Sequence, residues 1–118
     1  MDHQQLETWV QGYLHAWGTN NPDAIGQLFS TDARYYTEPF AEPWQGRATI
    51  VTNWLERKDE PGTYSFRYEI LGVTGERGFV RGWTQYHDPP RQYSNLWVIT
   101  FDRHGLCHEF TEWWMAHK

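Results

Sequence analysis

The chain has little of what marks secreted, membrane-spanning or heavily cross-linked proteins. Only one of its 118 residues is a cysteine, Cys107, so no disulfide can form within the chain, and this favours the cytoplasm. The first residues, MDHQQLETW, have neither the basic region nor the apolar run of a signal peptide. No apolar stretch approaches the ~20 residues of a membrane span. These absences predict a soluble, cytoplasmic protein without a membrane partner.

Basic residues are also few, and they do not cluster. Ten Lys and Arg stand against fifteen Asp and Glu, which gives a net charge of -5. The ten are spread along the chain and form no stripe, so nucleic-acid binding is not expected. No phosphate loop, nucleotide fingerprint or nucleophile triad is present, and no cofactor is predicted. His104, Cys107 and His108 lack a zinc spacing, and the last two point to opposite faces of one predicted strand, so no metal site is predicted either.

Aromatic residues, by contrast, are abundant. Eight Trp, seven Tyr and six Phe make up 18% of the chain, while the mean hydropathy is only -0.80. The apolar surface is therefore concentrated in a few large rings. Such rings fill cores, and they also line pockets for flat or apolar ligands because they lose little rotamer entropy on binding.

Helical signals dominate the first half of the chain. One face of an amphipathic helix over residues 3–18 collects Leu6, Trp9, Val10, Tyr13, Leu14 and Trp17. Asn21-Pro22-Asp23 then supplies a cap, a proline at the first helical position and an acid in the first turn, which predicts a short second helix with Ile25, Leu28 and Phe29 inward. A strand over 32–38, an irregular loop rich in proline and a third helix over 46–58 follow.

The second half has the texture of β structure. Strands are predicted over 64–74, 78–87, 93–101 and 107–115, separated by the turn segments TGER, DPPR and DRHG. Four sequential strands with short connections form an antiparallel meander. The order of elements predicts one α+β domain, residues 1–118, in which a curved and mostly antiparallel sheet wraps three helices.

Several motifs resemble the nuclear transport factor 2-like superfamily and, within it, the SnoaL-like (polyketide cyclase-like) proteins. They are Trp9-x3-Tyr13-x3-Trp17, Asn21-Pro-Asp-Ala-Ile25 with Leu28-Phe29, Asp32-Ala33, Glu42-Pro43-x2-Gly46-x3-Ile50, and Phe101-Asp-x2-Gly105-x3-Glu109-Phe110. The resemblance implies a cone-shaped, cystatin-like fold around a pocket, usually in a homodimer. It extends distantly to ketosteroid isomerase and limonene epoxide hydrolase, and it leaves the chemistry to be argued from the site.

The alternation of side chains sorts the strands into two faces. Alignment with the ketosteroid isomerase pattern assigns to the pocket Phe79, Arg81, Trp83, Gln85, Tyr93, Asn95, Trp97, Phe110, Glu112 and Trp114 from the strands, and Tyr13, Trp17 and Trp54 from the helices. The opposite face is also apolar, with Leu96, Val98 and Trp113. A second copy of the chain is the expected cover for it, so a homodimer through the convex face is predicted.

The candidate catalytic residues are Glu112, Arg81 and Tyr13. We expect Glu112 and Arg81 to form a buried pair inside the pocket, with Glu112 as base and Tyr13 or Arg81 stabilising an oxyanion. Epoxide hydrolase chemistry is disfavoured because Trp83 stands where that pattern has an Asp. Isomerase chemistry is disfavoured because the base position falls on Thr37 or Glu38, and the oxyanion acid falls on Trp97.

Three functions therefore stay open. The protein could be an acid–base enzyme of the isomerase, cyclase, dehydratase or hydrolase kind that acts on a small apolar or aromatic molecule. It could bind such a molecule without changing it. It could also be an assembly module whose pocket is filled by its own tryptophans.

Overall fold

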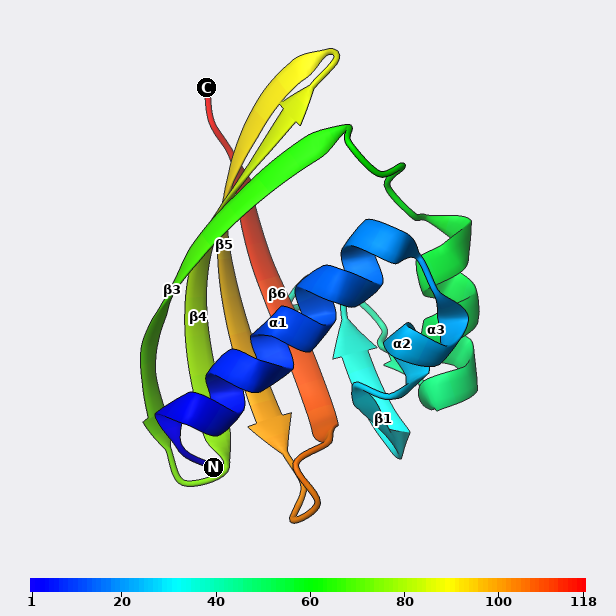
Figure 1. Ribbon diagram of the computed structural model, residues 1–118, viewed down its shortest axis with the longest axis vertical. Coiled ribbons are helices and arrows are strands. Elements are labelled where there is room, and N and C mark those ends of the chain that lie inside the picture. Colours follow the sequence, from blue (N-terminus) through cyan, green and yellow to red (C-terminus); the bar gives the residue numbers. More distant parts are fainter.

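Three helices pack against one six-stranded sheet in the computed structural model, which describes residues 1–118 (Figure 1). The helices are α1 (His3–Thr19), α2 (Pro22–Gly26) and α3 (Arg47–Glu56). The strands are β1 (Phe29–Tyr36), β2 (Trp44–Gln45), β3 (Tyr64–Thr74), β4 (Arg77–His87), β5 (Pro90–Phe101) and β6 (Cys107–Ala116). The predicted α+β class, with helices on a mostly antiparallel sheet, is confirmed.

The strand order is β2-β1-β6-β5-β4-β3, and only the β1–β6 pair is parallel. Strands β3 to β6 form the predicted meander, with each strand antiparallel to the next. Figure 1 shows these long strands curving past α1, while α2 and α3 lie beside β1. The curved sheet and α1 thus enclose the space in which the core and the candidate site lie.

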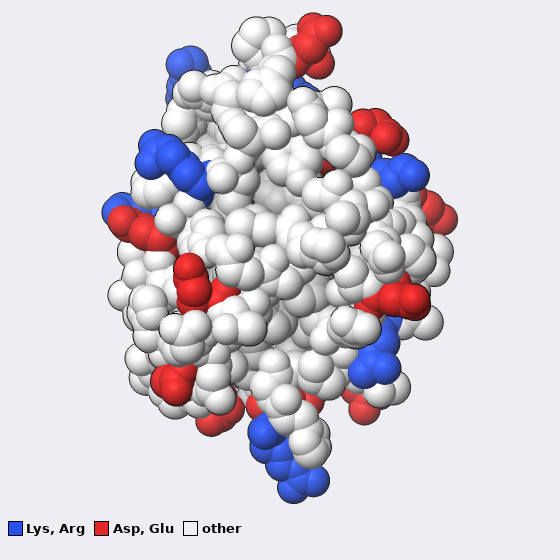
Figure 2. Space-filling model, viewed as in Figure 1, with Lys and Arg blue, Asp and Glu red and all other residues white.

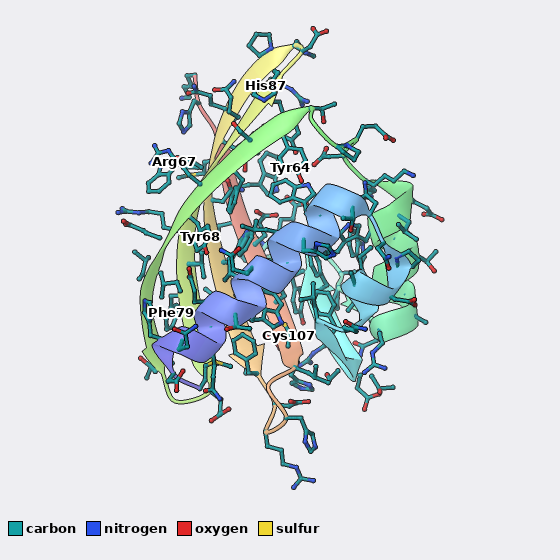
Figure 3. The ribbon with its side chains drawn as sticks, in the orientation of Figure 1. Tyr64, Arg67, Tyr68, Phe79, His87 and Cys107 are labelled. Carbon is teal, nitrogen blue, oxygen red and sulfur yellow. The ribbon has the colours of Figure 1, made fainter.

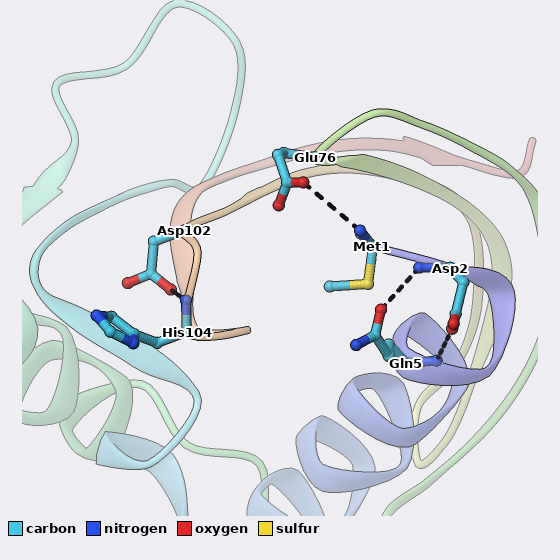
Figure 4. A network of polar contacts seen from close by, with 6 residues as sticks. All are labelled: Met1, Asp2, Gln5, Glu76, Asp102 and His104. Carbon is cyan, nitrogen blue, oxygen red and sulfur yellow. Dashed lines mark hydrogen bonds and ion pairs between the residues drawn. The ribbon is translucent and has the colours of Figure 1, made fainter.

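Helix α1 is fixed at both ends by local hydrogen bonds. Its capping box joins Gln5 N to an Asp2 carboxylate oxygen at 2.8 Å and Asp2 N to Gln5 Oε1 at 2.9 Å (Figure 4). After Thr19 the C-cap residue Asn20 adopts a left-handed conformation with φ 53, and its N donates to Ala16 O at 2.8 Å. Of the predicted apolar face, Leu6, Trp9, Val10 and Tyr13 are buried, whereas Leu14 and Trp17 are partly buried against the core.

Two predictions for the segment after α2 are wrong. The first strand begins at Phe29 and not at Asp32, because Phe29 pairs with Cys107 of β6 and Cys107 N donates to Leu28 O at 2.9 Å. Phe29 is buried as expected, but from a strand and not from a helix. The expected irregular loop contains β2, which pairs with β1. Parallel pairing with a distant strand leaves no signal in the local sequence.

The predicted phase of β4 is also wrong. Val80 lies opposite Trp97, and Thr84 lies opposite Tyr93, so these residues of β4 face the concave side. The residues expected there face the convex side, namely Phe79, Arg81, Trp83 and Gln85. The physical reason is that side-chain size does not mark the buried face of β4: its concave face includes Gly78 and Gly82, while large rings lie on the convex face. A concave residue without a side chain leaves room for the ring of Phe66 from β3.

The convex face carries both rings and charges. Arg67 and Arg81 flank the ring of Trp83, with guanidinium carbons 4.0 and 5.2 Å from its centroid, and Figure 3 shows Arg67 on the outer side of β3. Trp113 and Met115 are exposed on the same face. Homodimerisation through this face stays a prediction. Figure 2 shows charged side chains scattered around a largely uncharged centre.

None of the three helices has the length and hydropathy of a membrane-spanning segment.

Replacing Gly82 with Ala should destabilise the fold by about 1–3 kcal/mol, as overpacking of a core does. A Cβ at this position would overlap Phe66 Cζ and lie 2.6 Å from Phe66 Cε1. The Phe66 ring cannot move freely because it stacks on Trp97, with centroids 5.3 Å apart. Urea unfolding measures the effect. Gly72→Ala is the matched control, because a Cβ at Gly72 meets nothing within 4 Å; equal stability of the two variants would contradict this packing.

Candidate functional site

A cavity of about 380 Å³ lies between the concave face of the sheet and helices α1 and α3. Its inner end is formed by buried lining residues, which are Tyr13, Tyr35, Trp54, Thr84, Asn95 and Trp97. Its mouth is marked by exposed lining residues, which are Arg57, Lys58, Arg91 and Trp114. Figure 1 shows the α3–β3 loop and the β4–β5 hairpin, which carry the three cations, at the same end of the molecule.

The Glu112 carboxylate lines this cavity and is held from one side. Its Oε2 accepts hydrogen bonds from Asn95 Nδ2 at 2.8 Å and from Trp97 Nε1 at 3.0 Å. Both donors come from β5, where Trp97 lies directly opposite Glu112. No protein donor reaches Oε1. This oxygen is not one of the solvent-inaccessible side-chain atoms that lack a hydrogen-bond partner. One carboxylate oxygen is therefore fixed, and the other is available to a ligand.

A further hydrogen bond fixes the orientation of the Asn95 amide. Thr84 Oγ1 donates to Asn95 Oδ1 at 2.8 Å, and both residues are buried. With its oxygen engaged by Thr84, the amide must present its NH2 group to Glu112. Thr84 of β4 thus orients the Asn95 amide of β5, and this amide donates to the Glu112 carboxylate of β6.

Burial raises the pKa of Glu112 above its ordinary value of 4.5, because the aromatic surroundings disfavour the charged form. The hydrogen bonds from Trp97 and Asn95 oppose this effect by stabilising the carboxylate. Desolvation is the larger of the two effects. A carboxyl group with a raised pKa is a better proton acceptor and donor near neutral pH than an ordinary one.

Two tyrosines share the inner end of the cavity with Glu112. The hydroxyls of Tyr13 and Tyr35 are 2.9 Å apart and hydrogen-bonded, and their rings are buried among Trp54, Trp97 and Phe110. Burial, with the nearby Glu112 charge, raises the pKa of both hydroxyls, so both keep their protons. Only one of the two protons is used in the shared bond. The other can be donated to an oxygen atom of a ligand.

Asp59 organises the mouth of the cavity. Its Oδ2 accepts hydrogen bonds from Trp17 Nε1 at 3.0 Å and from the Tyr86 hydroxyl at 2.9 Å, and its backbone oxygen accepts from Asn20 Nδ2 at 3.0 Å. The α3–β3 loop is thereby tied to the end of α1 and to β4. Tyr64 stacks on Trp17 with centroids 4.1 Å apart, at the C-terminal end of α1 (Figure 3).

A model of the SnoaL-like domain matches residues 10–110, which is most of the chain. The chain belongs to the SnoaL-like family. Comparison with curated protein sequences finds no match. Several solved structures resemble this chain in fold, although their sequence identity to it is low. A similarity of this kind shows a shared fold and nothing about chemistry.

Three solved structures illustrate the range of this fold. An NTF-2 like protein of unknown function from Burkholderia xenovorans LB400 is 16% identical with a TM-score of 0.79, over 100% of this chain and 88% of the other. A candidate ketosteroid isomerase from Kribbella flavida DSM 17836 is 17% identical with a TM-score of 0.74, over 98% and 81%. An LEH-like epoxide hydrolase from M. tuberculosis is 15% identical with a TM-score of 0.72, over 95% and 84%.

The expected pair of Glu112 and Arg81 is not formed in this SnoaL-like domain. Arg81 lies on the convex face, pairs with Glu69 and has a side chain that is 53% exposed. The wrong phase of β4 is the cause. Arg81 therefore cannot stabilise an oxyanion in the cavity. Trp83 and Gln85 lie on the same convex face and do not line the cavity either.

The structure brings most of the other predicted residues together. Those that line the cavity are Tyr13, Trp17, Trp54, Tyr93, Asn95, Trp97, Glu112 and Trp114. Phe110 is fully buried behind them, in the core, and does not line it. Of the two candidates for the isomerase base position, Thr37 lines the cavity, whereas Glu38 is exposed outside it.

Several residues that line the cavity were not predicted from the sequence. They are Tyr35, Trp44, Phe66, Thr84 and Tyr86 in strands, and Arg57, Lys58, Asp59 and Arg91 near the mouth. A correct phase for β4 would have found Thr84 and Tyr86, and the alternation of Ala33 with Tyr35 could have found Tyr35. The loop residues carry no periodic signal, because only the tertiary fold brings them to the cavity.

The raised pKa of Glu112 predicts a pH dependence of stability. A carboxyl that holds its proton more tightly in the folded state stabilises the fold fully below the unfolded pKa of 4.5, and this contribution is lost as pH rises through the folded pKa. Glu112→Gln cannot titrate. The free energy of unfolding of the wild type, relative to this variant, should therefore fall as pH rises above 4.5.

Urea unfolding from about pH 4 to about pH 8 measures this difference. Glu38→Gln makes the same replacement at an exposed site outside the cavity and serves as the control. A wild-type stability that rises with pH relative to Glu112→Gln would contradict the raised pKa.

Proposed function

We propose that the cavity binds a small, largely apolar or aromatic molecule, and that Glu112 transfers a proton to or from it without a cofactor. The observation that carries this proposal is the unpaired Oε1 of a carboxylate whose other oxygen is fixed by Asn95 and Trp97. Asp59 also leaves one oxygen, Oδ1, without a protein donor, but it lies at the mouth, whereas Glu112 lies at the inner end beside the Tyr13–Tyr35 pair. The lining supports a ligand with an apolar or aromatic part because ten of its 18 residues are aromatic and offer stacking surfaces.

The proposed mechanism divides the work between Glu112 and the tyrosine pair. The Glu112 carboxylate accepts a proton from a ligand carbon next to a carbonyl, or from a water molecule that attacks the ligand. The carbonyl oxygen or leaving oxygen gains negative charge as the proton moves. The free hydroxyl proton of the Tyr13–Tyr35 pair stabilises that charge by a hydrogen bond. Isomerase, cyclase and hydrolase reactions share these two requirements.

A non-catalytic binding protein is the second candidate. The absence of a second carboxylate at the inner end favours it, because Asp59 lies at the mouth, where its Oδ2 accepts hydrogen bonds from Trp17 and Tyr86, and Arg81 lies outside the cavity. In that case Glu112 orients a ligand by accepting a hydrogen bond from it. The two candidates share the cavity and differ only in whether the ligand leaves changed.

Glu112→Gln separates the two. We incubate the protein with small aromatic ketones in D2O and with aromatic epoxides in ¹⁸O-labelled water, and we follow label uptake by mass spectrometry. Loss of a general base costs about 10²–10⁴-fold in rate, so the variant should incorporate label at least about 10²-fold more slowly while it still binds the ligand. Glu38→Gln, which changes the same group outside the cavity, should match the wild type.

Label uptake by Glu112→Gln at the wild-type rate would reject the catalytic role. Binding of these ligands by the wild type without label uptake would favour the binding protein.

A further inference from the structure

The cavity has an uneven distribution of charge between its two ends. The only carboxylate at the inner end is Glu112, which lies among buried rings. At the mouth, three cations line the cavity, which are Arg57, Lys58 and Arg91. The chain as a whole carries a net charge of -5, so this gathering of positive charge runs against the average of the molecule.

The three cations at the mouth face a single carboxylate, Asp59, which offsets only part of their charge. None of them takes part in an ion pair, and the three ion pairs of the molecule lie elsewhere. Asp59 is the only carboxylate at the mouth, and its Oδ2 is engaged by Trp17 and Tyr86. The guanidinium of Arg91 lies 4.7 Å from the Tyr86 ring centroid and that of Arg57 lies 5.8 Å from the Trp44 centroid.

The backbone segments that carry these cations are held in place by the fold. Arg57 N donates to the carbonyls of Asn53 and Trp54 at the end of α3, and Asp59 is tied to α1 and β4. Lys58 lies between these two anchored residues. Arg91 is in β5, where it pairs with Tyr86 of β4. A ligand group at the mouth would therefore meet positive charges from two separate elements.

We propose that the ligand is an aromatic or apolar molecule that carries an anionic group, such as a carboxylate, and that Arg57, Lys58 and Arg91 bind this group at the mouth. The inference rests on the proposed function of the cavity and specifies its ligand class. It also fixes the orientation of the ligand. The Glu112 carboxylate repels an anion from the inner end, so the charged group stays outside and the neutral part reaches Glu112 and the tyrosines.

Two fluorescent probes with the same ring system test the inference. 8-Anilinonaphthalene-1-sulfonate carries an anionic group, and N-phenyl-1-naphthylamine is its neutral counterpart. Both are titrated into the wild type, the triple variant Arg57→Gln/Lys58→Gln/Arg91→Gln, the single variant Arg91→Gln and the control Arg103→Gln. Arg103 is exposed in the β5–β6 turn and does not line the cavity, so the control changes net charge alone.

The triple variant should weaken binding of the sulfonate about tenfold more than binding of the neutral probe, since each exposed cation contributes a modest part. Arg91→Gln should give a smaller loss in the same direction, which keeps the test valid if changes at the end of α3 disturb folding. Added salt should weaken binding of the sulfonate more than binding of the neutral probe. Arg103→Gln should behave as the wild type.

Equal effects of the triple variant on both probes, or an equal loss in Arg103→Gln, would overturn the inference and leave the proposed function intact. If the wild type binds neither probe, the proposed ligand-binding function fails and the inference fails with it.

Discussion

The desolvated carboxylate of Glu112 is the constraint around which the concave side of this domain is arranged. A charged group among tryptophans and tyrosines is costly unless donors reach it. Here Trp97 and Asn95 supply those donors from the neighbouring strand, and Thr84 turns the Asn95 amide toward the carboxylate. The antiparallel register of β4, β5 and β6 places these residues side by side, so the sheet itself positions the candidate site.

The same rings that make the carboxylate unusual also keep space around it. The Tyr13 ring packs against the rings of Trp54, Trp97 and Phe110, with centroids 4.5–5.6 Å apart, so these side chains support one another beside the cavity. Gly82 admits the Phe66 ring on top of Trp97. The result is a cavity with a rigid apolar wall, one available carboxylate oxygen and one available hydroxyl proton.

Much of this arrangement could be predicted from the sequence, and the failures have clear physical causes. The spacing of Trp9, Tyr13 and Trp17 predicted α1. Alternation in β6, together with the resemblance to the ketosteroid isomerase pattern, correctly put Glu112 on the concave side. In β4 both faces carry large or polar residues, so alternation did not distinguish them, and Arg81 was assigned to the wrong side. The mouth was missed because Arg57 and Asp59 reach it only through tertiary contacts.

The most direct test of the account is a carbon-13 NMR titration of the glutamate carboxyl groups, with the Glu112 signal assigned by comparison with Glu112→Gln. We expect Glu112 to titrate above its ordinary pKa of 4.5. We also expect its carboxyl signal to shift when N-phenyl-1-naphthylamine is added. A Glu112 carboxyl that titrates at its ordinary pKa and does not respond to the neutral probe would contradict a buried carboxylate at the inner end of a ligand-binding cavity.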